Sequence, residues 1–196
     1  VDYKSYIYIN QQLVKTHIGG YSSFAVDITD YVKEGENEIF VIAEDDLRST
    51  EQPSGKQSHK FYSHGCSYTR TTGIWQTVWL EFVPKAYIKK AKYYPDPENG
   101  TITLIGEVCG KGEISVSALY EGKKVGGASV KSCGGHFSAQ LSLSEIHLWE
   151  PGHGRLYDLV LQFGNDVVKS YFGLRSVSLE DKKFMLNSQC VFQRFV

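Results

Sequence analysis

Hydrophobic and polar residues alternate along much of this chain, and no stretch repeats with a clear helical period. The alternation is clearest at residues 113–120, 136–143 and 157–163, where every second residue is apolar. An antiparallel strand with one face in the core and the other in water has this pattern. Each stretch therefore predicts a half-buried strand, and the shorter alternation at residues 24–28 predicts another.

Residues 39–43 are apolar at every position, which suits a central strand of a sandwich. Turn sequences separate the predicted strands: Asn99-Gly100, Glu121-Gly122, Gly134-Gly135 and Gly164-Asn165. Asn99-Gly100-Thr101 also fits the pattern for N-glycosylation, but we interpret it as a plain hairpin turn. Short strands at this spacing predict an all-β chain built of sandwiches.

A domain boundary is predicted near residues 83–86. The part before it is rich in aromatic residues and contains a long polar loop at residues 45–64. The part after it alternates regularly over about 95 residues, the usual size of an immunoglobulin-like sandwich. The chain opens on a strand-like run and closes on an apolar one, so we expect both ends to be cut from a longer protein.

Composition and charge exclude several classes of protein. The formal net charge is -1 and 41% of the residues are hydrophobic, as in a soluble globular protein. A nucleic-acid partner would require a basic face, and a membrane span about 20 apolar residues, so neither partner is expected. No targeting segment is visible, and we leave the compartment open with a preference for the cytoplasm. The four cysteines form no CxxC pair, and we expect reduced, mostly buried thiols.

Three groups of segments carry a family resemblance. The first is HIGGYSSFAVDITDYV at residues 17–32 with GENEI at 35–39, and the second is YTRTTGIWQTVWLE at 68–81. The third combines WEP at 149–151, LYDL at 156–159, SYFGLR at 170–175 and FMLN at 184–187. In this order they resemble the N-terminal half of glycoside hydrolase family 2, the β-galactosidase and β-glucuronidase group. The resemblance covers essentially the whole chain.

The resemblance implies a domain order. In that family a jelly-roll sugar-binding domain is followed by an immunoglobulin-like sandwich and then by a (β/α)8 barrel that holds two catalytic glutamates. Residues 1–84 would be the C-terminal part of the jelly roll and residues 85–181 the immunoglobulin-like β-sandwich. Residues 182–196 would lead into a barrel that this chain lacks. Relatives often have glycine where this chain has Ser188, which affects only the local turn.

The resemblance also implies a function. The chain would be a non-catalytic fragment of a retaining, exo-acting β-glycosidase of the β-galactosidase type, supporting the barrel and shaping the active-site mouth. Retaining hydrolysis needs two carboxyl groups about 5 Å apart, and both are expected on the barrel, so we expect this fragment to be inactive alone. Its partners would be its own barrel and a carbohydrate substrate, and a homo-oligomer is left open. No cofactor is expected, although a structural or active-site cation in the intact enzyme is left open.

Two functions of other classes compete with this interpretation. A free-standing carbohydrate-binding module should bind galactose, lactose or glucuronic acid, whereas a fragment is expected to bind none of them detectably. A cell-surface adhesion sandwich would fit the fold but would leave the segments at 68–81 and 170–175 unexplained.

Ser67, Tyr68 and Arg70 are the candidate site residues, because in relatives their loop reaches the mouth of the barrel. Arg70 could brace a carboxylate with two hydrogen bonds, and the ring of Tyr68 could stack on a sugar face. The residues would then form part of the substrate rim or of the domain interface. The alternative is that Arg70 only holds its loop in place.

Other candidate groups have structural explanations that we prefer. Asn37-Glu38 matches the family's Asn-Glu pair but begins a strand, so we do not assign it a catalytic role. His59, His64 and Cys66 lack an evident fourth zinc ligand, and residues 44–46 are expected to be solvated rather than to bind a cation. Trp75 and Trp79 would share one face of a strand and pack, rather than form a sugar platform.

Overall fold

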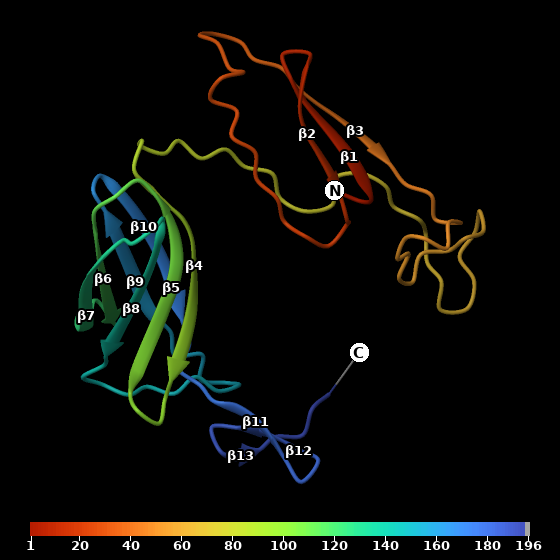
Figure 1. Ribbon diagram of the computed structural model, residues 1–196. Helices are drawn as coiled ribbons and strands as arrows, with labels where there is room; N and C mark the ends of the chain where they lie inside the picture. Colours follow the sequence, from red (N-terminus) through yellow and green to blue (C-terminus); the bar gives the residue numbers. More distant parts are fainter. Residues whose placement is uncertain (195–196) are drawn as a thin grey trace. The chain divides into compact units, whose positions relative to one another are not determined.

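The structure is a computed structural model that describes residues 1–194, and every regular element in that range is a β-strand (Figure 1). No helix in these residues is long and apolar enough to cross a membrane. The chain divides into two compact units, Val1–Leu80 (unit 1) and Glu81 onward (unit 2). The predicted all-β class is confirmed.

Unit 1 contains one three-stranded antiparallel sheet in the order β2-β1-β3. Its strands are β1 (Lys4–Ile9), β2 (Gln12–Ile18) and β3 (Ile39–Glu44). A tight turn at Asn10-Gln11 joins β1 to β2, and both residues are left-handed with φ of 48° and 69°. On β1 buried side chains alternate with half-buried ones, so one face of this central strand is buried and the other is partly exposed.

Three predictions about strands in unit 1 are wrong. Residues 39–43 lie on β3 at the edge of the sheet and are largely exposed, although their apolar sequence predicted a central strand. Residues 24–28 and 74–81 form no strand, and only Gly73, just before the second segment, makes an isolated bridge. Alternation states which side chains prefer burial, but a strand also needs a neighbouring chain that completes the hydrogen-bond ladder.

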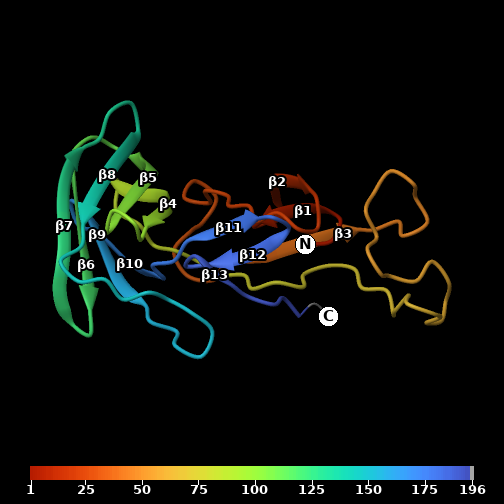
Figure 2. The ribbon, with the colours of Figure 1, turned by 90° about the horizontal axis from the view of Figure 1, so that it is seen from below.

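Unit 2 is a β-sandwich of two antiparallel sheets, with strand orders β4-β5-β8 and β10-β9-β6-β7 (Figures 1 and 2). The strands are β4 (Tyr87–Asp96), β5 (Thr101–Cys109), β6 (Glu113–Tyr120), β7 (Lys123–Lys131), β8 (His136–Ser142), β9 (Tyr157–Phe163) and β10 (Asp166–Phe172). The predicted strands at 113–120, 136–143 and 157–163 are β6, β8 and β9. Gly100, with φ of 60°, ends the turn between β4 and β5, so the hairpin interpretation of Asn99-Gly100 is confirmed.

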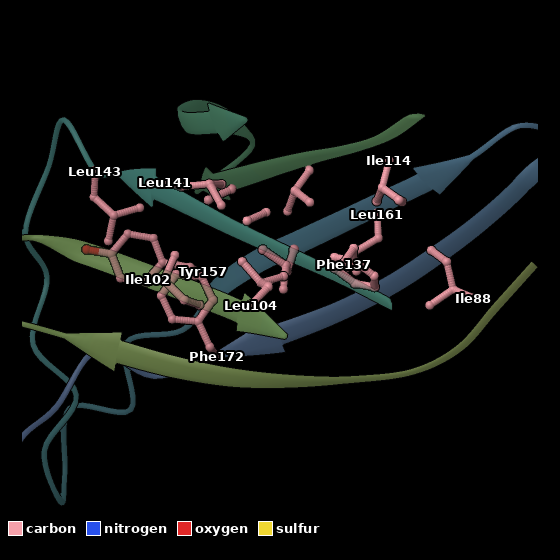
Figure 3. Packing of buried hydrophobic residues seen from close by; sticks show 14 of the residues in the cluster. Ile88, Ile102, Leu104, Ile114, Phe137, Leu141, Leu143, Tyr157, Leu161 and Phe172 are labelled. Atoms are coloured by element: carbon pink, nitrogen blue, oxygen red, sulfur yellow. The ribbon is translucent and has the colours of Figure 1, made fainter. Parts of the chain in front are cut away.

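The core of unit 2 lies between the two sheets. Ile102 and Leu104 of β5 and Leu141 of β8 are fully buried, as are Ile114 of β6 and Leu161 of β9. Figure 3 shows these side chains meeting between the sheets. On β8 buried and exposed residues alternate strictly, as the sequence pattern predicts for a strand with one face in the core.

Tyr157, at the start of β9, holds the connection from β8, which crosses from one sheet to the other. Its side chain is fully buried, and its ring stacks on Phe172 with 4.9 Å between ring centroids. The hydroxyl group donates a hydrogen bond to the Glu145 carbonyl at 2.9 Å and accepts one from the His147 amide at 2.7 Å. Immunoglobulin-like sandwiches use such a tyrosine corner to hold the connection that crosses between sheets. Burial raises the pKa of the Tyr157 hydroxyl above its usual value.

A small sheet follows the sandwich, with strand order β11-β12-β13. It contains β11 (Val177–Glu180), β12 (Lys183–Leu186) and β13 (Gln189–Cys190), and Figure 2 shows it clearly. Ser188 is left-handed with φ of 62°, the conformation that glycine adopts without strain. The predicted role of residues 182–196 as a lead into a barrel stays a prediction, and Phe195 and Val196 lie outside the described residues.

Candidate functional site

Three of the four segments in the third motif group meet around one side chain, Trp149. Its backbone amide donates a hydrogen bond to the Leu174 carbonyl at 2.9 Å. The guanidinium carbon of Arg175 lies 4.5 Å from the centroid of the Trp149 ring. Gly173 passes so close that a Cβ atom there would lie 3.1 Å from Cβ of Trp149. Residues 149–151 and 170–175, which are distant in sequence, therefore hold each other directly.

Asn187 ties the last motif segment to the same point. Its side-chain amide donates a hydrogen bond to the Trp149 carbonyl at 3.0 Å, and its Oδ1 accepts one from the Ser176 amide at 3.1 Å. The backbone is left-handed there, with φ of 50°, which asparagine tolerates better than most residues. We call Trp149, Gly173, Arg175 and Asn187 the Trp149 assembly. Its side chains are engaged with one another and with the backbone.

The first and second groups of motif segments meet in unit 1. The indole N–H of Trp75 donates a hydrogen bond to the Gly20 carbonyl at 2.8 Å, and the ring makes an edge contact with Tyr21. Asp2 and Gly73 exchange two backbone hydrogen bonds, at 2.9 and 2.8 Å. A Cβ atom on Gly20 would lie 2.3 Å from Oδ1 of Asp2, so any larger residue would have to displace the buried Asp2 carboxylate. We call Asp2, Gly20, Gly73 and Trp75 the Trp75 assembly.

The candidate site residues Ser67, Tyr68 and Arg70 lie in one loop of unit 1. Ser67 and His64 exchange two backbone hydrogen bonds, at 2.8 and 3.0 Å. Tyr68 is bound through its backbone to Lys56 and Ser58, while 58% of its surface is exposed. The backbone thus positions the loop and leaves the ring of Tyr68 free for contact with solvent or a ligand.

Arg70 lies against an aromatic ring. Its guanidinium carbon is 4.8 Å from the centroid of Phe61, and that of Arg48 is 5.2 Å from the same ring. The sequence motif pointed to Arg70 but not to Phe61 or Arg48. The one signal in the sequence, the absence of acidic residues from Gln52 to Leu80, marks a basic stretch but does not single out Phe61 and does not extend to Arg48.

The candidate metal ligands are not assembled. The rings of His59 and His64 lie edge to face, 5.3 Å apart, and Nδ1 of His64 is 3.2 Å from the hydroxyl of Ser58. The carboxylate of Asp45 accepts hydrogen bonds from Gln52 and Thr72. No group of three or more His, Cys, Asp or Glu side chains within residues 1–194 is arranged to hold a metal ion.

The Asn-Glu pair has a structural role in unit 1. The Asn37 side chain accepts a hydrogen bond from the Lys33 amide at 2.8 Å and another from Asn10 at 2.9 Å. Glu38 donates its backbone amide to the Asn10 side chain at 3.0 Å. The pair therefore holds the turn before β3 against the hairpin turn of β1 and β2.

The burial of the cysteine and tryptophan side chains was also predicted. The expectation of mostly buried thiols is wrong, because Cys66, Cys133 and Cys190 are exposed and Cys109 is half-buried, although all four are free. Cys66 and Cys133 lie at turns, where the chain has little to pack against. Trp75 and Trp79 are 49% and 65% exposed in this chain, and their predicted packing stays a prediction.

Comparison with known proteins agrees with the resemblance. Residues 86–175 match the model of glycosyl hydrolases family 2. A putative beta-glucuronidase of Formosa agariphila is 27% identical, aligned over 99% of this chain and 24% of its own length. A beta-galactosidase of Thermoanaerobacter pseudethanolicus is 25% identical, aligned over 93% of this chain and 26% of its own length. The chain thus spans about a quarter of the length of these relatives.

Solved structures share the fold. The b-glucuronidase from Ruminococcus gnavus in complex with C6-substituted uronic isofagomine has a TM-score of 0.77 and 23% identity. The match covers 98% of this chain and 34% of that one. The structure of beta-D-glucuronidase from Dictyoglomus thermophilum has a TM-score of 0.65 and 22% identity over 96% of this chain.

Proposed function

Since this chain resembles glycosyl hydrolases family 2 over nearly all of its length, we propose that it is a non-catalytic part of a longer retaining, exo-acting β-glycosidase. Residues 1–84 would be part of a jelly roll, residues 85–181 the immunoglobulin-like sandwich and residues 182–196 the entry to a barrel. The two carboxyl groups of retaining hydrolysis would lie on that barrel.

One observation supports the proposal most strongly: the residues of the shared motifs are used to hold the chain together. In the Trp149 assembly, Asn187 and Arg175 contact Trp149 directly. In the Trp75 assembly, the indole N–H is bonded to the Gly20 carbonyl. Catalytic polar groups converge on a pocket where a substrate can bind, whereas the polar groups of these two assemblies bond to the backbone and to one another. They favour a supporting role.

The rim residues Ser67, Tyr68 and Arg70 belong to the same proposal. Tyr68 presents an exposed ring from a loop whose backbone is fixed by hydrogen bonds to its neighbours. An exposed ring in a fixed loop can shape the mouth of an active site without taking part in the chemistry. The substrate would be a β-glycoside, and the motifs favour a β-galactoside, while the similar proteins carry both beta-galactosidase and beta-glucuronidase names.

The test compares the 196-residue chain with the full product of its gene. The full product should hydrolyse an aryl β-galactoside or an aryl β-glucuronide, and the purified chain should hydrolyse neither. In the full product, Tyr68→Ala should raise KM more than it lowers kcat, because a rim contact acts on binding. Turnover by the chain alone that survives rigorous purification would refute the proposal, as would a full product without glycosidase activity.

Calorimetry separates this proposal from a free-standing carbohydrate-binding module. The chain should bind neither galactose, lactose nor glucuronic acid at about millimolar affinity, which corresponds to about 4 kcal/mol of binding free energy. Binding of any of these sugars at that affinity would favour the module instead.

A further inference from the structure

Unit 1 carries an exposed aromatic ring with two arginine side chains beside it. Phe61 is 83% exposed, and both guanidinium groups lie within the range of a cation–π contact. On the next residue, the ring of Tyr62 is 63% exposed and lies 5.5 Å from Nζ of Lys60. We call Arg48, Lys60, Phe61, Tyr62 and Arg70 the Phe61 cluster. It presents three cations and two aromatic faces on one loop region.

The cations of the Phe61 cluster have no counter-ion in the part of the chain that the structure describes. None of the three lies within 4.0 Å of a carboxylate oxygen. Asp45 is engaged by Gln52 and Thr72, and Asp46 accepts a hydrogen bond from the Arg48 backbone amide. The guanidinium groups share one ring and so lie no more than about 10 Å apart, where two like charges repel each other and favour an anion.

The loop that carries the cluster is held by an internal hydrogen-bond network. The side chain of Ser58 is 1% exposed, and its hydroxyl donates to the Tyr62 carbonyl at 2.8 Å. The same oxygen accepts a hydrogen bond from the Lys60 amide at 3.1 Å. The Ser58 amide donates to the Tyr68 carbonyl at 2.7 Å. The side chains of Lys60, Phe61 and Tyr62 therefore project from a backbone held by hydrogen bonds, and a ligand need not order this part of the loop on binding.

From this arrangement we infer that the Phe61 cluster binds an anionic oligosaccharide. Cations lie over the rings of Phe61 and Tyr62, but both residues are largely exposed, and the uncovered parts of the rings can contact the apolar faces of sugar rings. Arg48 and Arg70 can each take a carboxylate or sulfate group in a two-point hydrogen bond. Two guanidinium groups around one ring suit a chain of at least two acidic sugars. An isolated acidic monosaccharide would engage only one of them and should bind below detection.

The charge of the chain favours a short acidic saccharide over a nucleic acid. A nucleic acid carries one charge per ~1.7 Å of duplex and needs an extended basic face. Residues 52–80 contain only three Lys or Arg side chains, which with Arg48 are too few for an extended basic face, in a chain whose net charge is -1. The cluster shares Arg70 with the proposed substrate rim, but its test measures binding by the chain alone, so it can fail while the proposed glycosidase function stands.

The test is calorimetry on the 196-residue chain with three oligosaccharides of four sugars each. Tetragalacturonate offers carboxylates, a chondroitin sulfate tetrasaccharide adds sulfates, and a neutral galactotetraose offers sugar rings alone. At least one acidic tetrasaccharide should bind and the neutral one should not. Raising the salt concentration from ~50 mM to ~300 mM should weaken the binding severalfold, because screening shortens the range of the attraction.

Paired variants locate the site. Arg48→Gln with Arg70→Gln should weaken binding at least about tenfold, which is the loss of about one charge-assisted contact. Lys131→Gln with Lys169→Gln removes the same charge from exposed positions of unit 2 and should leave the affinity within about twofold. Phe61→Ala should also weaken binding. Amide shifts in the unsubstituted chain should be confined to the region around residues 46–70, which checks the site even if a variant misfolds.

Each of several results would overturn the inference. These are no binding of either acidic tetrasaccharide, equal binding of the neutral one, equal losses in the two paired variants, or shifts centred outside unit 1. Tighter binding of a single-stranded oligonucleotide of the same charge would show a general polyanion site instead.

Discussion

Replacing Tyr157 with phenylalanine tests whether the tyrosine corner stabilises the sandwich. The substitution keeps the ring and its stacking on Phe172 but removes the hydroxyl that bridges the Glu145 carbonyl and the His147 amide. Each buried polar group that loses its partner costs about 1–3 kcal/mol. Because the connection at Glu145 is only part-buried, water can replace some of the loss, and we expect unit 2 to lose ~2 kcal/mol of unfolding free energy.

A loss of this size should lower the melting temperature of unit 2 by ~8 °C. Urea unfolding, with hydrogen exchange of the β6 and β9 amides as the readout specific to unit 2, measures the change. Tyr120→Phe is the matched control, because Tyr120 stacks on His147 but its hydroxyl has no hydrogen-bond partner within residues 1–194. The control should cost less than ~0.5 kcal/mol. A Tyr157→Phe variant as stable as the control would refute the assigned role of the hydroxyl.

Three further predictions concern the Trp149 assembly and acid stability. Asn187→Ala should lower the unfolding free energy of unit 2 by ~2 kcal/mol in urea unfolding, because it removes the hydrogen bonds to Trp149 and Ser176 and places alanine at a positive φ. Asn187→Gly also removes these hydrogen bonds but adopts the positive φ without strain, so it should recover part of the loss. Gly173→Ala should lower the unfolding free energy by ~1–2 kcal/mol, because the hydrogen bond from the Trp149 amide holds Trp149 against the new Cβ atom. A Gly173→Ala variant as stable as the original chain would show that Trp149 can move away. Hydrogen bonds from a lysine and a histidine lower the pKa of Glu145 below its usual value of 4.5, so its contribution to stability is present above that pH and is lost as the pH falls through the lowered pKa. Glu145→Gln should therefore reduce the drop in the urea midpoint between about pH 7 and pH 3, and an unchanged drop would contradict this assignment.

The sequence pattern was most informative in the sandwich of unit 2. On β6, β8 and β9 one face is buried and the other meets water, so the alternation of residue types records the environment directly. The same rule failed on β3 and on residues 24–28 and 74–81. There the side chains had the composition of strands, but the sheet of unit 1 contains only three strands that pair. Periodicity describes a preference for burial and cannot report which neighbour supplies the hydrogen bonds.

In the candidate site, too, some residues could be predicted from the sequence and others only from the structure. Arg70 and Tyr68 were identifiable because they belong to a motif, but Arg48 and Phe61 became visible only when the loop was folded. A cation–π contact joins residues through space and leaves no fixed spacing in the sequence.

By itself, the sequence determined the all-β class, the strands of the sandwich and the family that the chain resembles, because alternation, turn residues and ordered motifs are local properties. Only the tertiary structure decided what the motif residues do. Trp149, Gly173 and Asn187 are separated along the chain. Their shared role follows from the 3.0 Å hydrogen bond between Asn187 and the Trp149 carbonyl and from the close approach of Gly173 to Trp149, which no sequence spacing encodes. The same holds for Phe61 and its two arginines, since the proximity of unpaired charges is set by the packing of the loop.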